Sequence, residues 1–471
     1  MANKEPHSSV RLVWRGSLTI SLAAACTTPL PAQSSAPDGY WLSDGYGYFY
    51  EYRDGRIADF WDVTDDFCRP VQPDELELEN HELPRAKFRV NTAGNQMFLS
   101  TVSDPHEIRF HKVDGLPGQC NQTIQNTPTA NFDAFAGYFD QHYPFFELHD
   151  VLWAEQVSKA RAKITPDTSN EELFEIFKSL IKPIKDVHLS IEGEIGGEKK
   201  GFRSGHSTFE ASLENYAKAQ GISFHDAVLR HQKGYWETDI KAILGKEPAS
   251  AGDDAIRYGI TQSGVGYIAI VAQGGYSGGD TVEEDIAAAH TIMDRIIGEF
   301  HAAQVRAVVI DVSVNMGGYD AVSRAIASHF ADERRLAYSK QAADADDPLM
   351  TAIHIAPAKG KRFTGPVYVM TGDATRSAGE TFTLALRAFP HVTHVGERTR
   401  GSLSDQFYKA LPNGWYLSLG NELYTDKDGI EWEKVGVEPH IAFTVFDPSD
   451  PTQGRIKAVR TIEAMVDQAE Q

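Results

Sequence analysis

A serine at the junction of a strand and a helix is the residue of this chain best placed for covalent chemistry. The apolar, β-favouring run Val367–Met370 precedes Ser377, and residues 380–387 carry apolar side chains at helical spacing. N–H groups at the start of a helix lack intrahelical partners, so they can stabilise negative charge generated at such a serine. Ser377 therefore has the position of a nucleophile. The alternative is that it only caps the helix, as serines often do.

Six short motifs occur in a fixed order around this serine. They are Asp186-Val-His188, Val308–Asp311 with Asn315–Gly318, Ser377-Ala-Gly-Glu380, Val395–Gly401, Leu411–Trp415 and Trp432–Pro439. Together they resemble the tail-specific (C-terminal processing) serine peptidases and the related core of the tricorn protease. The resemblance covers roughly residues 130–445. It implies an α/β fold with a crotonase/ClpP-like βαβ spiral core, and an enzyme that hydrolyses peptide or protein substrates.

The resemblance also proposes a base for this serine. In most tail-specific proteases the base is a lysine just after the glycine that corresponds to Gly401, and here that residue is Ser402. Lys409 lies further along the chain and is not expected to replace it. The tricorn-like branch uses a histidine and a glutamate instead, and its motifs match His188 and Glu433. A neutral imidazole suits the role of base because its unperturbed pKa lies near working pH.

Several neighbours of these residues depart from the tricorn-like pattern. Val187 stands where the tricorn core has a serine, and His440 stands where the family usually has an aspartate. Glu431 and Glu438 are close rivals to Glu433 as the group that orients the histidine. If the resemblance holds, Glu433 fixes the imidazole ring and stabilises the imidazolium formed during the reaction.

The oxyanion of an acyl-transfer reaction needs backbone donors. The N–H of Ala378 opens the helix after Ser377, and a second donor fits Gly317 or Gly318, where glycine permits close approach of the main chain. The alternative is that these glycines form a plain turn. His391 and His394 would point to opposite faces of a strand, which argues against a metal site. No metal or cofactor is expected.

Composition limits the other functions open to the chain. Its 471 residues are too many for one core, and a hydrophobic content of 41% is that of a globular protein. The formal net charge of −21 should repel nucleic acid and anionic lipid, so neither is an expected partner. The sequence contains no apolar span long enough for an ordinary transmembrane helix. The oligomeric state stays open.

The N-terminus has the features of an export signal. Basic residues precede the short run Gly16–Ala25 of small and apolar residues, and Cys26 follows at once. Residues 1–25 are therefore predicted to be a signal or lipoprotein peptide, with Cys26 as the lipidated residue and the only membrane contact. The alternative is an ordinary signal that is cut a few residues later, for instance after Ala32. Either prediction places the protein in a bacterial cell envelope, as a periplasmic protein or a membrane-anchored lipoprotein.

Changes in composition and in the spacing of apolar residues divide the rest of the chain into parts. The predicted parts are a tether (26–38), a small β domain (39–126), a helical subdomain (127–255), an α/β catalytic core (256–446) and a C-terminal helix (447–471). Residues 193–205 are Gly/Lys-rich and are predicted to be a loop. The aromatic runs of the β domain predict the core of a small sheet, with a ligand surface as the alternative. No peptide-binding PDZ module is evident.

Two cysteines remain if Cys26 is lipidated or removed. Cys68 and Cys120 form an even pair, which in an exported protein can be a disulfide, and the alternative is two buried thiols.

Two other functions fit parts of the pattern. The same fold resembles retinoid-binding relatives without a working peptidase site, and the missing lysine is compatible with a binding protein for an apolar ligand or peptide. A hydrolase of small esters is the second alternative.

Overall fold

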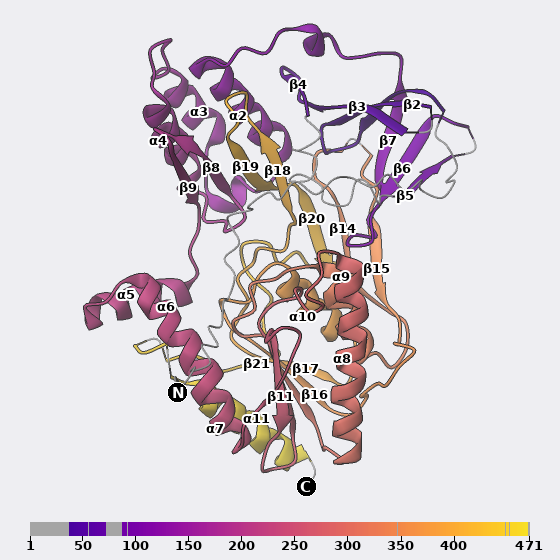
Figure 1. Cartoon of the computed structure of the whole chain (residues 1–471), viewed down its shortest axis with the longest axis vertical. Helices are drawn as coiled ribbons and strands as arrows, with labels where there is room; N and C mark the ends of the chain where they lie inside the picture. Colours follow the sequence, from indigo (N-terminus) through magenta and orange to yellow (C-terminus); the bar gives the residue numbers. More distant parts are fainter. Residues whose placement is uncertain are drawn as a thin grey trace, which may run out of the picture.

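The computed structural model describes residues 37–54, 56–71, 87–91, 93–345, 347–447, 449–451 and 453–469. The predicted signal peptide, Cys26 and nearly all of the predicted tether lie outside these residues. The described residues form a mixed α/β structure with four sheets (Figure 1). No helix in this part of the chain combines the length and apolar character needed to cross a membrane.

The first part of the chain forms a seven-stranded antiparallel sheet, called here the N-terminal sheet, with the order β4-β3-β2-β1-β7-β6-β5. Its strands are β1 (Gly39–Ser43), β2 (Tyr48–Arg53), β3 (Arg56–Val63), β4 (Cys68–Pro70), β5 (Lys87–Val90), β6 (Gln96–Ser100) and β7 (Ile108–Val113). Because side chains alternate along a strand, Tyr48 and Tyr50 pack toward the helical part of the chain, while Phe49 packs on the opposite face. The aromatic runs therefore form a core, as predicted. A disulfide joins Cys68 and Cys120 on the Phe49 face.

A helical segment follows. Its elements are η2 (Gly118–Asn121), α2 (Pro128–His142), η3 (Glu147–His149), α3 (Trp153–Arg161) and α4 (Asn170–Ile181). A capping box opens α4, because the side chains of Ser169 and Glu172 each accept the other residue's backbone N–H.

The predicted loop at 193–205 is wrong: these residues belong to a hairpin of β8 (Ser190–Ile195) and β9 (Glu198–Arg203). Gly196 and Gly197 have φ of 64° and 80°, which are the values that a tight two-residue hairpin turn requires. The turn geometry outweighs the low strand preference of the surrounding lysines and glutamates. The helical elements that follow are α5 (Thr208–Gln220), α6 (Phe224–Lys233), the π-helical turn η4 (Gly234–Asp239) and α7 (Ile240–Leu244).

The central sheet has the order β10-β11-β12-β13-β16-β17-β21 and is parallel from β12 onward. Its strands are β10 (Ala249–Ala251), β11 (Ile256–Ile260), β12 (Gly266–Ile270), β13 (Val308–Asp311), β16 (Val367–Thr371), β17 (Val392–Gly396) and β21 (Ile441–Ala442). One face packs against α8 (Val282–Ala302), α9 (Asp320–Ser328) and α10 (Ala378–Arg387), and the other against α7 and α11 (Arg455–Ala469). Covered on both faces, β13 and β16 are continuous apolar runs.

Two smaller sheets complete the structure. One has the order β15-β14-β20, and the other β18-β19-β8-β9. Their remaining strands are β14 (Arg335–Ala342), β15 (Thr351–Ile355), β18 (Gln406–Ala410), β19 (Tyr416–Gly420) and β20 (Glu422–Asp426). The pairing of β19 with β8 joins the last third of the chain to the helical segment. In the upper part of Figure 1, the N-terminal sheet and the α2–α4 helices lie above the central sheet.

The parallel pairing of β13 with β16 determines where the site forms. Val308 to Asp311 pair in register with Val367 to Met370, so the two strands end at the same edge of the sheet. The loops that follow them, which carry Asn315–Gly318 and Ser377, therefore meet at that edge.

Candidate active site

Ser377 occupies a strained turn between β16 and α10. It is the residue before the helix, with φ of 54° and ψ of −130°, and its side chain makes no capping hydrogen bond to α10. Helix capping therefore does not account for this serine. A non-glycine residue at positive φ is costly by about 1–3 kcal/mol, and such strain is concentrated at functional sites.

Backbone hydrogen bonds hold this turn from both sides. The N–H of Ser377 donates to the carbonyl of Ser402 at 3.0 Å, and the Ser377 carbonyl accepts the N–H of Glu380 at 2.7 Å. The N–H of Arg376 donates to the carbonyl of Asn315 at 3.1 Å. The strained conformation is thus fixed by the loops that follow β13 and β17.

Two glycines lie against the serine. Gly317 and Gly318 have φ of 101° and 138°, and a Cβ on Gly317 would come within 2.7 Å of the Ser377 Cβ. A Cβ on Gly318 would overlap the carbonyl oxygen of Gln273. Both positions therefore require glycine, for conformation and for space.

Not all the predicted oxyanion donors are available. The N–H of Gly317 donates to Asn315 Oδ1 at 2.8 Å. The N–H groups of Ala378 and Gly318 have no hydrogen-bond partner within the described part of the chain. Met316 and Tyr319, which flank the two glycines, have side chains that are 38% and 42% exposed. The turn therefore offers two free donors beside an accessible apolar surface.

Glu380 forms hydrogen bonds with the loop that carries Ser402. Its carboxyl group accepts the Thr399 hydroxyl at 2.6 Å and the N–H groups of Gly401 and Ser402 at 2.7 Å each. Burial raises the pKa of Glu380 to about 7, although these three donors oppose the shift. Glu380 was part of a motif in the sequence, but nothing there indicated that it supports the loop at the lysine position.

His188 lies in the turn between α4 and β8 and is 6% exposed. Its backbone N–H donates to Asp186 Oδ1 at 2.8 Å, and its carbonyl accepts the Ser418 hydroxyl at 2.5 Å. Burial lowers the pKa of the ring, while the Asp186 carboxylate and a hydrogen bond to the Ser404 backbone oppose the shift. Nδ1 has no partner among the described residues.

Glu433 is the buried member of the three candidate glutamates, since Glu431 and Glu438 are exposed. Its Oε2 accepts the N–H groups of Leu403 at 2.9 Å and Ser404 at 3.0 Å. Burial raises the pKa of Glu433 well above its usual value, and the charges of Asp186 and Glu380 add to this effect.

The segment from Ser402 to Ser404 contacts each of these three residues. Ser402 holds the backbone of Ser377, and the Ser404 backbone contacts both the His188 ring and Glu433. Within the described residues, no hydrogen bond joins the side chains of Ser377, His188 and Glu433 directly. Asp186 was part of the resembling motif, but its contacts with His188 and with the Tyr143 hydroxyl, at 3.0 Å, required the three-dimensional structure.

Lys409, His391 and His394 have other partners. Lys409 is fully buried and binds Asp62 Oδ1 at 2.6 Å and the Tyr46 carbonyl at 3.1 Å, so it links β18 to the N-terminal sheet. His394 Nε2 lies 2.7 Å from the Thr371 hydroxyl. The described residues contain no cluster of side chains suited to a metal ion.

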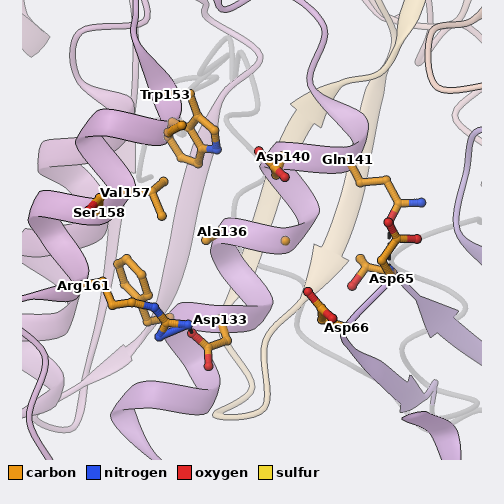
Figure 2. Close-up of a pocket in the computed structure, with 14 residues that line it drawn as sticks. Asp65, Asp66, Asp133, Ala136, Asp140, Gln141, Trp153, Val157, Ser158 and Arg161 are labelled. Carbon is orange, nitrogen blue, oxygen red and sulfur yellow. Dashed lines mark hydrogen bonds and ion pairs between the residues drawn. The ribbon is translucent and has the colours of Figure 1, made fainter. Parts of the chain in front are cut away.

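Ser377 opens onto a cavity of about 350 Å³, which also contacts Gly318, Tyr319 and residues of the N-terminal sheet. A second cavity, of about 620 Å³, lies between α2, α3 and the turn after β3. Figure 2 shows its lining of aspartates, with Arg161 and Trp153 on α3. It contains none of the predicted site residues, so the candidate site is the smaller cavity.

Residues 264–443 match the model of Peptidase family S41. This segment is a serine peptidase domain. It includes Ser377, Glu433 and the two glycines, while the candidate base His188 precedes it in the chain, in the turn before β8.

Solved structures share this fold. One is a "putative peptidase" from Parabacteroides merdae ATCC 43184, 23% identical with a TM-score of 0.56, over 73% of this chain and 97% of that chain. Mature CPAF is 14% identical with a TM-score of 0.51, over 73% of this chain and 97% of that chain. These likenesses establish a common fold that extends beyond the matched domain.

Proposed function

We propose that the protein is a serine endopeptidase in which Ser377 attacks the peptide carbonyl and forms an acyl-enzyme. The observation that carries this proposal is the strained, accessible Ser377 turn with two free N–H groups beside it. Strain at a nucleophile and preorganised donors for the oxyanion are the features that acyl transfer requires.

In the proposed mechanism, neutral His188 accepts the Ser377 proton and later donates it to the leaving amine. Burial of the ring, which lowers its pKa, keeps the base neutral at physiological pH. Replacement of the family lysine by Ser402 supports a histidine base and the tricorn-like branch. Because Ser404 contacts both His188 and Glu433, we assign Glu433 to orient the ring and to stabilise the imidazolium through its carboxylate charge.

The proposed oxyanion hole consists of the N–H groups of Ala378 and Gly318. The N–H of Gly317 already binds Asn315, so we assign Gly317 the role of allowing the loop to approach Ser377 closely. The parallel order β12-β13-β16-β17 supports assignment of the core to the crotonase/ClpP-like spiral folds.

Labelling with a fluorophosphonate tests the nucleophile directly. Wild-type protein should take up one equivalent at Ser377, located by peptide mapping, and should cleave unfolded casein. The same protein should be compared on matched peptide and ester substrates. Faster turnover of esters with no peptide cleavage would favour the small-ester hydrolase, and binding without labelling would favour the binding protein.

We also propose export to a bacterial cell envelope, with Cys26 as the lipid-bearing residue. Lipid would be the only anchor, so Cys26→Ala should move the protein from the membrane fraction to the soluble envelope fraction. A wild-type protein that is already soluble in the envelope would refute lipidation and leave export standing.

A further inference from the structure

The cavity at Ser377 lies between the S41 domain and the N-terminal sheet. Ser377 and Gly318 line one side of it, and residues from β2, β6, β7 and the loop between β6 and β7 line the other. Its volume of about 350 Å³ falls within the range of about 300–1,000 Å³ typical of ligand pockets. The N-terminal sheet is thus placed to contact a substrate bound at Ser377.

One buried lysine lies among the acidic residues of this cavity. Lys340 is 2% exposed, and its Nζ contacts Asp104 at 2.6 Å, Asp405 at 3.0 Å and Glu422 at 3.0 Å. Burial works against the charge of Lys340, but the three carboxyl groups raise its pKa well above the usual value. A single permanent cation therefore faces three acidic groups.

The acidic groups keep excess negative charge at the cavity surface. Burial raises the pKa of Glu422 to about 7, and its Oε1 accepts the Tyr46 hydroxyl at 2.6 Å, so this group is only partly ionised near neutral pH. Asp104 and Asp405 are 32% and 49% exposed and offer oxygens to an incoming ligand. Burial lowers the pKa of the nearby His106 to about 4, so His106 adds no positive charge.

The remaining walls suit an aliphatic or aromatic contact. The same cavity is also lined by Tyr46, Tyr48, Leu99, Ile108 and Phe407. Lysine and arginine side chains pack their methylene stems on such surfaces and place the charged end against carboxylates.

We propose that this cavity binds a lysine or arginine side chain of the peptide substrate close to the scissile bond, and that Asp405 determines this specificity. The proposal rests on the peptidase function above and adds its substrate class. Asp405 is the residue that fits best because it is half exposed and directly follows Ser404, which contacts the His188 ring and Glu433. A bound cation would share its carboxylate with Lys340.

The test uses peptides that are identical except for one position beside the cleavage site, first mapped on casein by mass spectrometry. Peptides with lysine or arginine should exceed the norleucine peptide in kcat/KM by about 10-fold or more, and a glutamate peptide should be poorest. Asp405→Asn should reduce the lysine/norleucine ratio to within about 3-fold, while Asp405→Glu should retain most of it.

The matched control is Asp467→Asn. Asp467 is 55% exposed on α11 and has a single basic partner, Arg306 at 2.7 Å, so its variant should keep the wild-type ratio. The readout is the ratio of kcat/KM for the lysine peptide to kcat/KM for the norleucine peptide. This ratio separates charge recognition from any general loss of activity that Asp405→Asn causes through His188. An unchanged ratio in Asp405→Asn would overturn the proposal.

Binding to Ser377→Ala, measured by calorimetry with the lysine and norleucine peptides, separates this proposal from the peptidase function. Cleavage by the wild type without a basic preference overturns only the specificity. A basic preference in binding that Asp405→Asn removes, without any cleavage by the wild type, overturns only the peptidase function. If the wild type shows no cleavage and the Ser377→Ala protein shows no selective binding, both proposals are overturned.

Discussion

The N–H of Ser377 donates to the carbonyl of Ser402 at 3.0 Å. Ser402 stands where the resembling lysine-dependent peptidases have their base, and its own N–H is bound by Glu380 at 2.7 Å. In this chain the position therefore supports the backbone of the nucleophile turn. We propose that the base comes from another element, and His188 is a titratable group whose ring contacts the next part of this segment, at Ser404.

Ser377→Ala should lower kcat/KM for peptides by at least about 10³-fold, because the covalent route is lost while substrate binding and the oxyanion donors remain. Alanine should tolerate the positive φ about as well as serine does, so the unfolding midpoint should change little. Turnover of the purified variant and its thermal unfolding are the two measurements. Activity equal to that of the wild type would contradict the assignment of the nucleophile.

The acidic limb of the pH profile should report His188. A base must be deprotonated to act, and burial lowers the pKa of His188, so kcat/KM should rise with pH through an apparent pKa below about 6.5. His188→Ala should lower kcat strongly and remove this limb. The measurement is kcat/KM between pH 4.5 and 8 in both proteins. A limb that persists in an active His188→Ala enzyme would show that another group is the base.

Lys409→Ala should affect stability more than chemistry. Lys409 and Asp62 are both fully buried and 2.6 Å apart, and removing the lysine leaves Asp62 with only the longer ion pair to Arg69, at 3.4 Å. The loss should therefore lie at the lower end of about 3–5 kcal/mol in the free energy of unfolding. Urea unfolding measures this loss, and active-site titration gives the activity of each folded molecule. That activity should stay near the wild-type value, which a catalytic lysine would not allow.

The double variant Lys409→Met with Asp62→Leu is the control for that loss. Removing both charges avoids a buried carboxylate without its lysine but also takes Asp62 from Arg69, so the double variant should recover part of the stability lost in Lys409→Ala. An equal or larger loss would mean that the pairing of Asp62 with Lys409 and Arg69, rather than the carboxylate left behind by Lys409→Ala, dominates the effect.

Local patterns in the sequence were sufficient to predict most of the strands and helices of the α/β region, residues 256–446. The apolar runs of β13 and β16 and the helical spacing after Ser377 predicted the strand and helix order, because each pattern reflects burial within one element. The 193–205 hairpin was missed because two turn glycines decided it against the propensity of its lysines and glutamates.

The candidate site required contacts between distant segments. Glu433 could not be separated from Glu431 and Glu438 in the sequence, because burial alone distinguishes them. The choice between Gly317 and Gly318 as donor depended on the hydrogen bond from Gly317 to Asn315. The cavity beside Ser377 was not predictable either, because half of its lining comes from the N-terminal sheet.

Glu433→Gln should show how the imidazolium is stabilised. Glutamine keeps the shape of Glu433 and can still accept the N–H groups of Leu403 and Ser404. The variant loses the carboxylate charge that we propose stabilises the imidazolium, so kcat should fall by about 10- to 10³-fold, less than in His188→Ala. Glu431→Gln, at an exposed neighbouring position, is the matched control and should keep wild-type kcat. Steady-state kinetics at pH 7 are the measurement, and a kcat equal to the wild type would remove Glu433 from the mechanism.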